Sequence, residues 1–136
     1  MKKLIGFAQV VLCVFCACNA FAQIGTRNGG RVHPIIVGGG DHTIMNEAGT
    51  LWLWGKNDNG QLGNGTTTNA SLAAPISNLT GVVAMAARNL HTLALESDGT
   101  VWAWGDNQYG QLGDGTTTDR TTAVQTSSLT SRLIPN

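Results

Sequence analysis

The chain has 136 residues, of which 42% are hydrophobic, and its eight basic and eight acidic side chains give a formal net charge of zero. The charges are scattered along the sequence, which argues against a basic nucleic-acid surface and against a polybasic membrane-binding patch. Eighteen glycines and few charges favour an all-β protein built from short strands and many turns.

The first 22 residues are predicted to be a bacterial-type secretory signal peptide. Lys2 and Lys3 precede an almost uninterrupted apolar run, Leu4–Cys18, that is too short to span a membrane as a helix. Small residues at both ends of Ala20–Ala22 then favour cleavage before Gln23. The sequence therefore predicts an exported protein that is periplasmic, secreted or held at the cell surface. Its mature part has about two more acidic than basic residues.

All three cysteines, Cys13, Cys16 and Cys18, lie in this apolar run, so the mature chain is expected to fold without disulfides. The Cys13-x-x-Cys16 spacing resembles a redox or zinc pair, but its place in a discarded segment argues against that interpretation. Lipid attachment at Cys18 is the less favoured processing route, because Phe15 stands where a leucine would be expected.

A long internal repeat is the dominant feature of the mature chain. Trp52–Thr68 reads WLWGKNDNGQLGNGTTT, and Trp102–Thr118 reads WAWGDNQYGQLGDGTTT. The offset is 50 residues from Trp52 onward but 49 at His42 and His91, so the first copy lacks one residue before its tryptophans. We expect this deletion to shift the strand register and to leave the first repeat imperfect or bulged, because a one-residue slip turns every side chain to the opposite face.

Each repeat is predicted to form a four-stranded antiparallel sheet. In the second copy the expected order is strand 82–86, strand 91–95, a hairpin turn at 97–100, strand 101–105 and an outer strand 122–125. The indoles of Trp102 and Trp104 should share one face of their strand. Four strands in about 50 residues are typical of a β-propeller blade, in which the tryptophans would fill the space between neighbouring blades.

The segment HTLALESDGTVWAWGDNQYGQLGDG resembles the repeat of the regulator-of-chromosome-condensation family, whose members form seven-bladed propellers. The resemblance covers roughly residues 35–131. The matching positions are His91, Thr92, Gly99, Trp102, Gly105, Asn107 and Gly110–Gly113.

The expected organisation is a signal peptide, a short leader, two propeller-type repeats and the truncated start of a third, at residues 1–22, 23–34, 35–81, 82–131 and 132–136. Two blades do not close a ring, and such an array would expose unpaired edges. Three explanations stay open: a fragment or degenerate remnant, several copies that close a ring together, or docking on a larger repeat protein. Three copies would supply six blades and four copies eight, both known propeller sizes.

The sequence offers no catalytic, cofactor or metal-binding constellation, and we expect the protein not to be an enzyme. His42 and His91 occupy matching places and are interpreted as scaffold residues, whereas His33 has no partner with metal-ligand spacing. The glycine-rich stretch 37–43 lacks the ending of a phosphate-binding loop. The loops that begin at Asn57 and Asn107 fit a calcium loop poorly, and their Asn and Gly residues are interpreted as turn formers with left-handed backbone.

The differences between the two copies suggest a partner surface, because loops on one rim of a propeller bind partners. Four of the five differences inside the repeated phrase fall in the loop that follows the tryptophan strand. The predicted contact residues are Lys56, Asp58, Asp106, Gln108 and Tyr109. The alternative is that they are merely unconstrained surface residues.

Two classes of function remain open. The resemblance implies an exported protein–protein interaction module that binds a protein, with no nucleic acid and no membrane insertion of the mature chain. Relatives include a nuclear nucleotide-exchange factor and exported propellers that inhibit β-lactamases, but this chain shows no match to the specific surfaces of either. The alternative is a remnant of a longer propeller, or a self-assembling or capping unit without separate activity.

Overall fold

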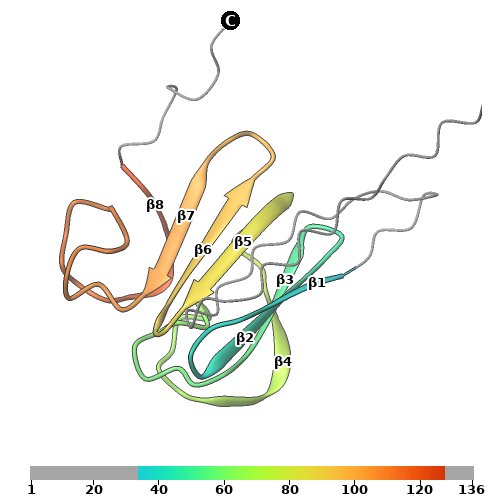
Figure 1. Ribbon diagram of the computed structural model, residues 1–136, viewed down its shortest axis with the longest axis horizontal. Helices are drawn as coiled ribbons and strands as arrows, with labels where there is room; N and C mark the ends of the chain where they lie inside the picture. Colours follow the sequence, from blue (N-terminus) through green and yellow to red (C-terminus); the bar gives the residue numbers. More distant parts are fainter. Residues whose placement is uncertain (1–33, 128–136) are drawn as a thin grey trace, which may run out of the picture.

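The computed structural model describes residues 34–127 as two four-stranded antiparallel sheets, each with its strands in chain order (Figure 1). The first blade consists of β1 (Ile35–Gly38), β2 (His42–Glu47), β3 (Thr50–Gly55) and β4 (Ala70–Ile76). The second blade consists of β5 (Val82–Arg88), β6 (His91–Glu96), β7 (Val101–Gly105) and β8 (Arg120–Gln125). The expected all-β fold of two four-stranded sheets is confirmed. Within residues 34–127, no helix is long and apolar enough to cross a membrane.

Several sequence predictions fall on residues outside the described range. They are the signal peptide, the three cysteines, His33 and the start of a third repeat at 132–136. Inside that range the predicted strands of the second copy are confirmed, and the structure extends the outer strand β8 back to Arg120.

The predicted register shift in the first blade was wrong. His42 pairs with Gly55 at the open end of the β2–β3 hairpin, as His91 pairs with Gly105 in the second blade. Met45 likewise lies opposite Trp52, as Ala94 lies opposite Trp102. The irregularity between β3 and β4 recurs at the same place between β7 and β8, so the first blade is as well formed there as the second.

The missing residue is absorbed by the hairpin turn. In the first blade Glu47 pairs with Thr50 across a two-residue turn in which Ala48 and Gly49 have φ values of 52° and 90°. In the second blade the turn is one residue longer, and Gly99, at φ 90°, donates its N–H to the carbonyl oxygen of Glu96 at 3.0 Å. Both loop lengths suit the right-handed twist of a hairpin, so the paired strands keep their faces.

The hydrophobic core lies between the two sheets. The first blade turns one face of β2 and β3 toward the second blade, and Ile44, Leu51 and Leu53 on that face are at most 2% exposed. The second blade contributes residues of β5, β6 and β7 to this core, and β5 contacts both β1 and β2. The core residues contributed by the second blade include Met85, Ala87, Ala94 and Trp104.

Candidate functional site: the loops and the blade interface

The repeated phrase of the first blade docks on the second blade through the main-chain oxygen of Gln61. This oxygen accepts a hydrogen bond from the indole Nε1 of Trp104 at 2.8 Å and a second one from Oγ1 of Thr92 at 3.0 Å. Both donors belong to the second blade, and all three residues are fully buried. Trp104 fills the space between the two blades, as expected for a tryptophan of the repeat, and it also donates a hydrogen bond to the other blade.

Two glycines of this phrase allow the close approach. A Cβ atom built on Gly63 would lie 2.8 Å from Nε1 of Trp104, and one built on Gly60 would lie 2.7 Å from Cα of Thr121. Both glycines also have positive φ values, 79° at Gly60 and 66° at Gly63. The glycines are therefore required both by the turn and by the neighbouring blade.

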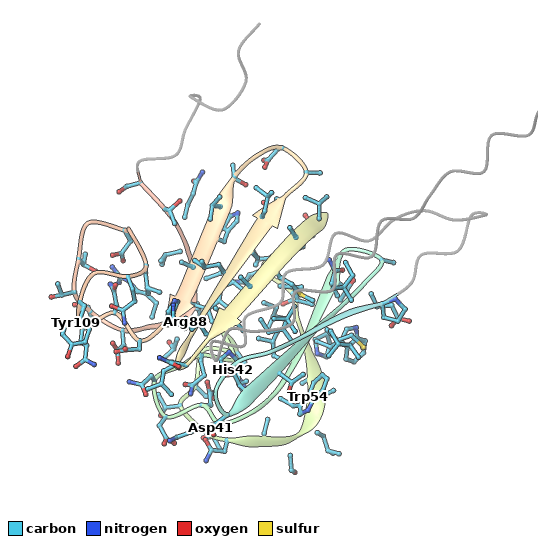
Figure 2. All side chains as sticks on the ribbon, viewed as in Figure 1. Asp41, His42, Trp54, Arg88 and Tyr109 are labelled. Atoms are coloured by element: carbon cyan, nitrogen blue, oxygen red, sulfur yellow. The ribbon has the colours of Figure 1, made fainter. Side chains whose placement is uncertain are left out.

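His42 is a buried residue of this interface and lies where the two sheets meet (Figure 2). Its Nε2 lies 3.0 Å from Oγ1 of Thr92, which bridges it to the Gln61 oxygen. Burial lowers the pKa of His42 below its ordinary value, and burial also lowers the pKa of His91. His42 is accordingly a neutral interface residue, which agrees with its interpretation as part of the scaffold.

Asn57 and Asn107 shape the loops with their side chains. The Asn57 amide donates to the carbonyl oxygens of Thr66 at 2.9 Å and Thr68 at 3.1 Å, while its Oδ1 accepts from the N–H of Leu62 at 2.9 Å. Asn107 makes the same three hydrogen bonds within its own loop. The left-handed conformation expected of these asparagines was wrong: the glycines carry it, and each asparagine closes a loop of about a dozen residues.

Four of the five predicted contact residues lie on the outside of these loops. Tyr109 is 84% exposed at the outer tip of the β7–β8 loop (Figure 2). Asp58 and Gln108 are also exposed. Lys56 is half-buried, with its Nζ 3.5 Å from the Asp58 carboxylate and 3.9 Å from that of Asp41.

The fifth predicted contact residue, Asp106, points inward. It is 9% exposed, and its Oδ2 accepts from Nε2 of Gln111 at 2.6 Å. In the first blade Lys56 stands at the matching position and supplies no acceptor, so Nε2 of Gln61 is buried without a hydrogen-bond partner among the described residues. Asp106 thus holds its own loop in shape.

The second loop also contains a shielded ion pair. Asp114 lies 2.6 Å from Nη2 of Arg120 and has a side chain only 6% exposed. Hydrogen bonds from Thr116, Arg120 and Asn107 hold the pKa of Asp114 at about 2. Within the described residues, no group of three or more His, Cys, Asp or Glu side chains could hold a metal ion.

The repeat pattern and the blade geometry agree with family comparisons. The regulator of chromosome condensation (RCC1) repeat matches residues 48–95 and 98–133, and a second model of the same repeat matches 82–111. The chain belongs to the RCC1 repeat family. The first matched unit runs from the β2–β3 turn into β6, so one RCC1 repeat joins the outer half of one blade to the inner half of the next.

Known relatives are much longer than this chain. Protein RCC2 of Mus musculus is 41% identical over 78 residues, which cover 54% of this chain and 15% of the relative. Human WBSCR16 superposes with a TM-score of 0.62 at 25% identity, over 71% of this chain and 28% of that one. Prp20p of Saccharomyces cerevisiae superposes with a TM-score of 0.64 at 19% identity, over 75% and 27% of the two chains. The chain therefore spans less than a third of each of these RCC1-type proteins.

Proposed function

We propose that the protein is a non-enzymatic, exported protein–protein interaction module, and that its partner binds the loops between the third and fourth strand of each blade. The observation that carries this proposal is the contrast between the two loops. They share the same asparagine-centred hydrogen bonds, yet they differ in charge and size at their exposed positions. Loops that are held rigid by a scaffold and vary at their tips are typical of binding surfaces.

The structural relatives are consistent with a protein partner. Prp20p binds Gsp1p and histones, and a second structure holds Kap60 bound to yeast RCC1 (Prp20), with a TM-score of 0.54 at 26% identity over 75% of this chain and 24% of that one. For the present chain we place the contact at Lys56, Asp58, Gln108 and Tyr109. Tyrosine is a frequent anchor at such interfaces, since its ring buries a large area at low entropic cost.

The test is site-directed photo-cross-linking in the organism that makes the protein. A photoreactive phenylalanine analogue replaces Tyr109 in one variant and Ser97, in the hairpin at the opposite end of the second blade, in the other (Figure 1). The proposal expects a discrete cross-linked protein from position 109 only, and a purified partner whose affinity falls at least tenfold when Lys56, Asp58 and Gln108 are replaced by alanine. Identical cross-linking from both positions, or an unchanged affinity, contradicts it.

The alternative function is that of a remnant of a longer propeller, or of a self-assembling or capping unit. It is favoured by one observation: within residues 34–127, no further blade covers the two outer faces of the blade pair.

A further inference from the structure

The interface between the two blades is formed by one face of each blade. The equivalent face of the other blade lies, in both cases, on the outside of the molecule. The head face is the side of the first blade turned away from the second, and its four marker residues are Ile36, Thr43, Met45 and Trp54. The strand pairing gives each of them a counterpart in the second blade. All four counterparts are at most 3% exposed because they pack on the first blade: Met85, Thr92, Ala94 and Trp104.

The head face lacks such a cover among the described residues. Ile36 is 59% exposed, whereas its counterpart Met85 is 3% exposed. Trp54 is half-buried, and it lies on the side of the first sheet away from the second (Figure 2). The positions that make one side of the internal interface thus recur on an open surface, where Thr43 and Trp54 are identical to their counterparts and Ile36 and Met45 are also apolar.

The tail face is the side of the second blade turned away from the first, and it consists of Leu93, Leu95 and Val101 together with the loop Gly110–Gly113. Leu93 and Val101 are half-buried, whereas their counterparts in the first blade, Ile44 and Leu51, are at most 1% exposed. These tail-face side chains line a shallow apolar depression of about 160 Å³.

The loop of the tail face repeats the sequence that docks inside the chain. Gly110–Gly113 reads GQLG, as does Gly60–Gly63. Gly60 and Gly63 are buried against the second blade, but Gly113 is exposed and Gly110 is half-buried. Among residues 34–127, the nearest atom that a Cβ on Gly110 would meet is the carbonyl oxygen of Thr116, at 3.7 Å.

We propose that the head face of one molecule binds the tail face of a second copy of this chain. The contact reproduces the internal interface: the Gln111 carbonyl oxygen accepts from Trp54 Nε1 and Thr43 Oγ1 of the next copy, as the Gln61 oxygen accepts from Trp104 and Thr92. Complementarity to a second copy follows from the chain itself, because the two surfaces repeat the two sides of a contact that this sequence already makes. Both surfaces are apolar at their centre, where Ile36 and Met45 lie on the head face and Leu93 and Leu95 lie on the tail face.

The contact joins unlike surfaces, and such contacts form a closed ring when the rotation between neighbouring copies closes. Trp54 belongs to the head face and Tyr109 adjoins the tail face, and the two residues lie on opposite sides of the molecule (Figure 2). The head face of a chain therefore cannot bind the tail face of the same chain. With two blades in each copy, rings of three or four copies give propellers of six or eight blades, both of which are known sizes. Of the proposed partner residues, Gln108 matches Asp58, which stays exposed at the internal interface, but Tyr109 matches Asn59, whose amide donates to Asp119 of the second blade at 3.0 Å.

The test uses the protein expressed from the full 136-residue sequence and a pair of matched glycine variants. Gly110 matches Gly60, where an added Cβ would lie only 2.7 Å from the backbone of the next blade, so Gly110→Ala should block the contact. Gly115 matches Gly65, where the nearest described atom to an added Cβ is 3.9 Å away, so Gly115→Ala should leave the contact intact. The backbone strain is alike, because the φ values are 75° and 80°. Light scattering should give three or four chain masses for wild type and Gly115→Ala, and the association of Gly110→Ala should be at least about tenfold weaker.

A complementation experiment tests the head-to-tail geometry itself. Gly110→Ala has a blocked tail face and an intact head face, whereas Trp54→Ala has a disrupted head face and an intact tail face. Each variant alone should therefore be monomeric. An equimolar mixture should form a dimer through the head face of the first variant and the tail face of the second. A wild-type protein that has the mass of one chain at all concentrations overturns the proposal, as does equal assembly of the two glycine variants. Assembly only after the addition of a polypeptide that carries further RCC1 repeats also overturns it, and identifies another blade as the occupant. The two proposals are distinguishable at position 109, because a cross-link to a second copy of this chain supports head-to-tail assembly, whereas a cross-link to a different polypeptide supports the proposed function.

Discussion

The indole of Trp104 and the carbonyl oxygen of Gln61 are separated by 43 residues in the sequence and joined by a 2.8 Å hydrogen bond between the two sheets. A side chain of the second blade thus recognises the loop backbone of the first blade. The tryptophan comes from the second copy of the repeated phrase, and the glycine-flanked loop that accepts its hydrogen bond comes from the first copy.

The first prediction concerns the glycine beneath Trp104. Gly63→Ala should lower the free energy of unfolding by about 1 to 3 kcal/mol more than Gly113→Ala, because it adds a methyl group against a fully buried indole. The two glycines share the same backbone cost, with φ values of 66° and 65°, and a Cβ on Gly113 has 3.8 Å to its nearest neighbour. Urea denaturation of both variants in the Gly110→Ala background, where the tail face is blocked and Gly113 meets no second copy, measures the difference. Equal destabilisation would show that the interface near Gly63 is loosely packed.

The asparagine at the centre of each loop should tolerate little change. Asn107→Asp keeps the shape of the side chain but removes the amide donors to the carbonyl oxygens of Thr116 and Thr118, so we expect a loss of about 2 to 3 kcal/mol in unfolding free energy. Asn78→Asp, at an exposed position, is the control and should change stability by less than about 0.5 kcal/mol. A comparable effect of the two substitutions would rule out the proposed closure of the loop by Asn107.

The short hairpin of the first blade offers a stabilising substitution. Ala48 has a φ of 52°, which residues other than glycine and asparagine seldom adopt. Ala48→Asn should therefore raise the unfolding free energy by about 0.5 to 1 kcal/mol, since Asn-Gly is the preferred pair in such a turn. Ser97→Asn, in the longer hairpin, should give no comparable gain because Ser97 has no positive φ. Thermal unfolding of the two variants tests this, and a lower melting temperature for Ala48→Asn would contradict the two-residue turn.

The side-chain amide of Gln61, which has no hydrogen-bond partner among the described residues, offers a second substitution that should stabilise the fold. Lys56→Asn supplies a neutral acceptor at the position where Asp106 accepts from Gln111 in the second blade, and should add about 1 kcal/mol of stability. The reciprocal change, Asp106→Ala, leaves Nε2 of Gln111 without its acceptor and should cost about 1 to 3 kcal/mol. Chemical denaturation at neutral pH measures both. Opposite signs for the two variants support the assignment, and a loss in both contradicts it.

Stability should fall in two steps as the solution is acidified. The pKa values of His42 and His91 lie below the ordinary 6.5 in the folded protein, so the unfolded chain binds protons first as the pH falls below about 6.5. The pKa of Asp114 is held at about 2, so a further loss follows as the pH falls from about 4 toward 2. His42→Gln should flatten the first step in a pH series of denaturation midpoints. An unchanged first step in a His42→Gln, His91→Gln double variant would contradict the assignment.

Much of the fold could be predicted from the sequence, because the blade has a clear strand period and the repeat occurs twice. Val82–Ala86, His91–Leu95 and Val101–Gly105 all lie within observed strands. The error in the first blade came from treating a one-residue deletion as a change of register. A hairpin turn exists in two-residue and three-residue forms, so its length can vary without moving Trp52 relative to Met45.

The interface residues were harder to predict from sequence. The central acceptor at Gln61 is a main-chain oxygen, which every residue has, so its role depends on where the loop places it. Asp106 was predicted to contact a partner because it differs from Lys56, but the structure turns it inward to Gln111. One available signal was the identity of Asn57 and Asn107 in loops whose neighbouring positions differ, which is explained by their buried side chains.

The buried indole of Trp104 docks the second blade on the first. Hydrogen exchange at the tryptophan Nε1 positions, followed by NMR in the Gly110→Ala variant, tests it most directly, because Trp54 stays uncovered there and provides an internal reference. We predict that the Trp104 Nε1–H exchanges only on global unfolding, while that of the half-buried Trp54 exchanges much faster. Equal, fast exchange at both indoles would show that the blades open independently and would contradict the account.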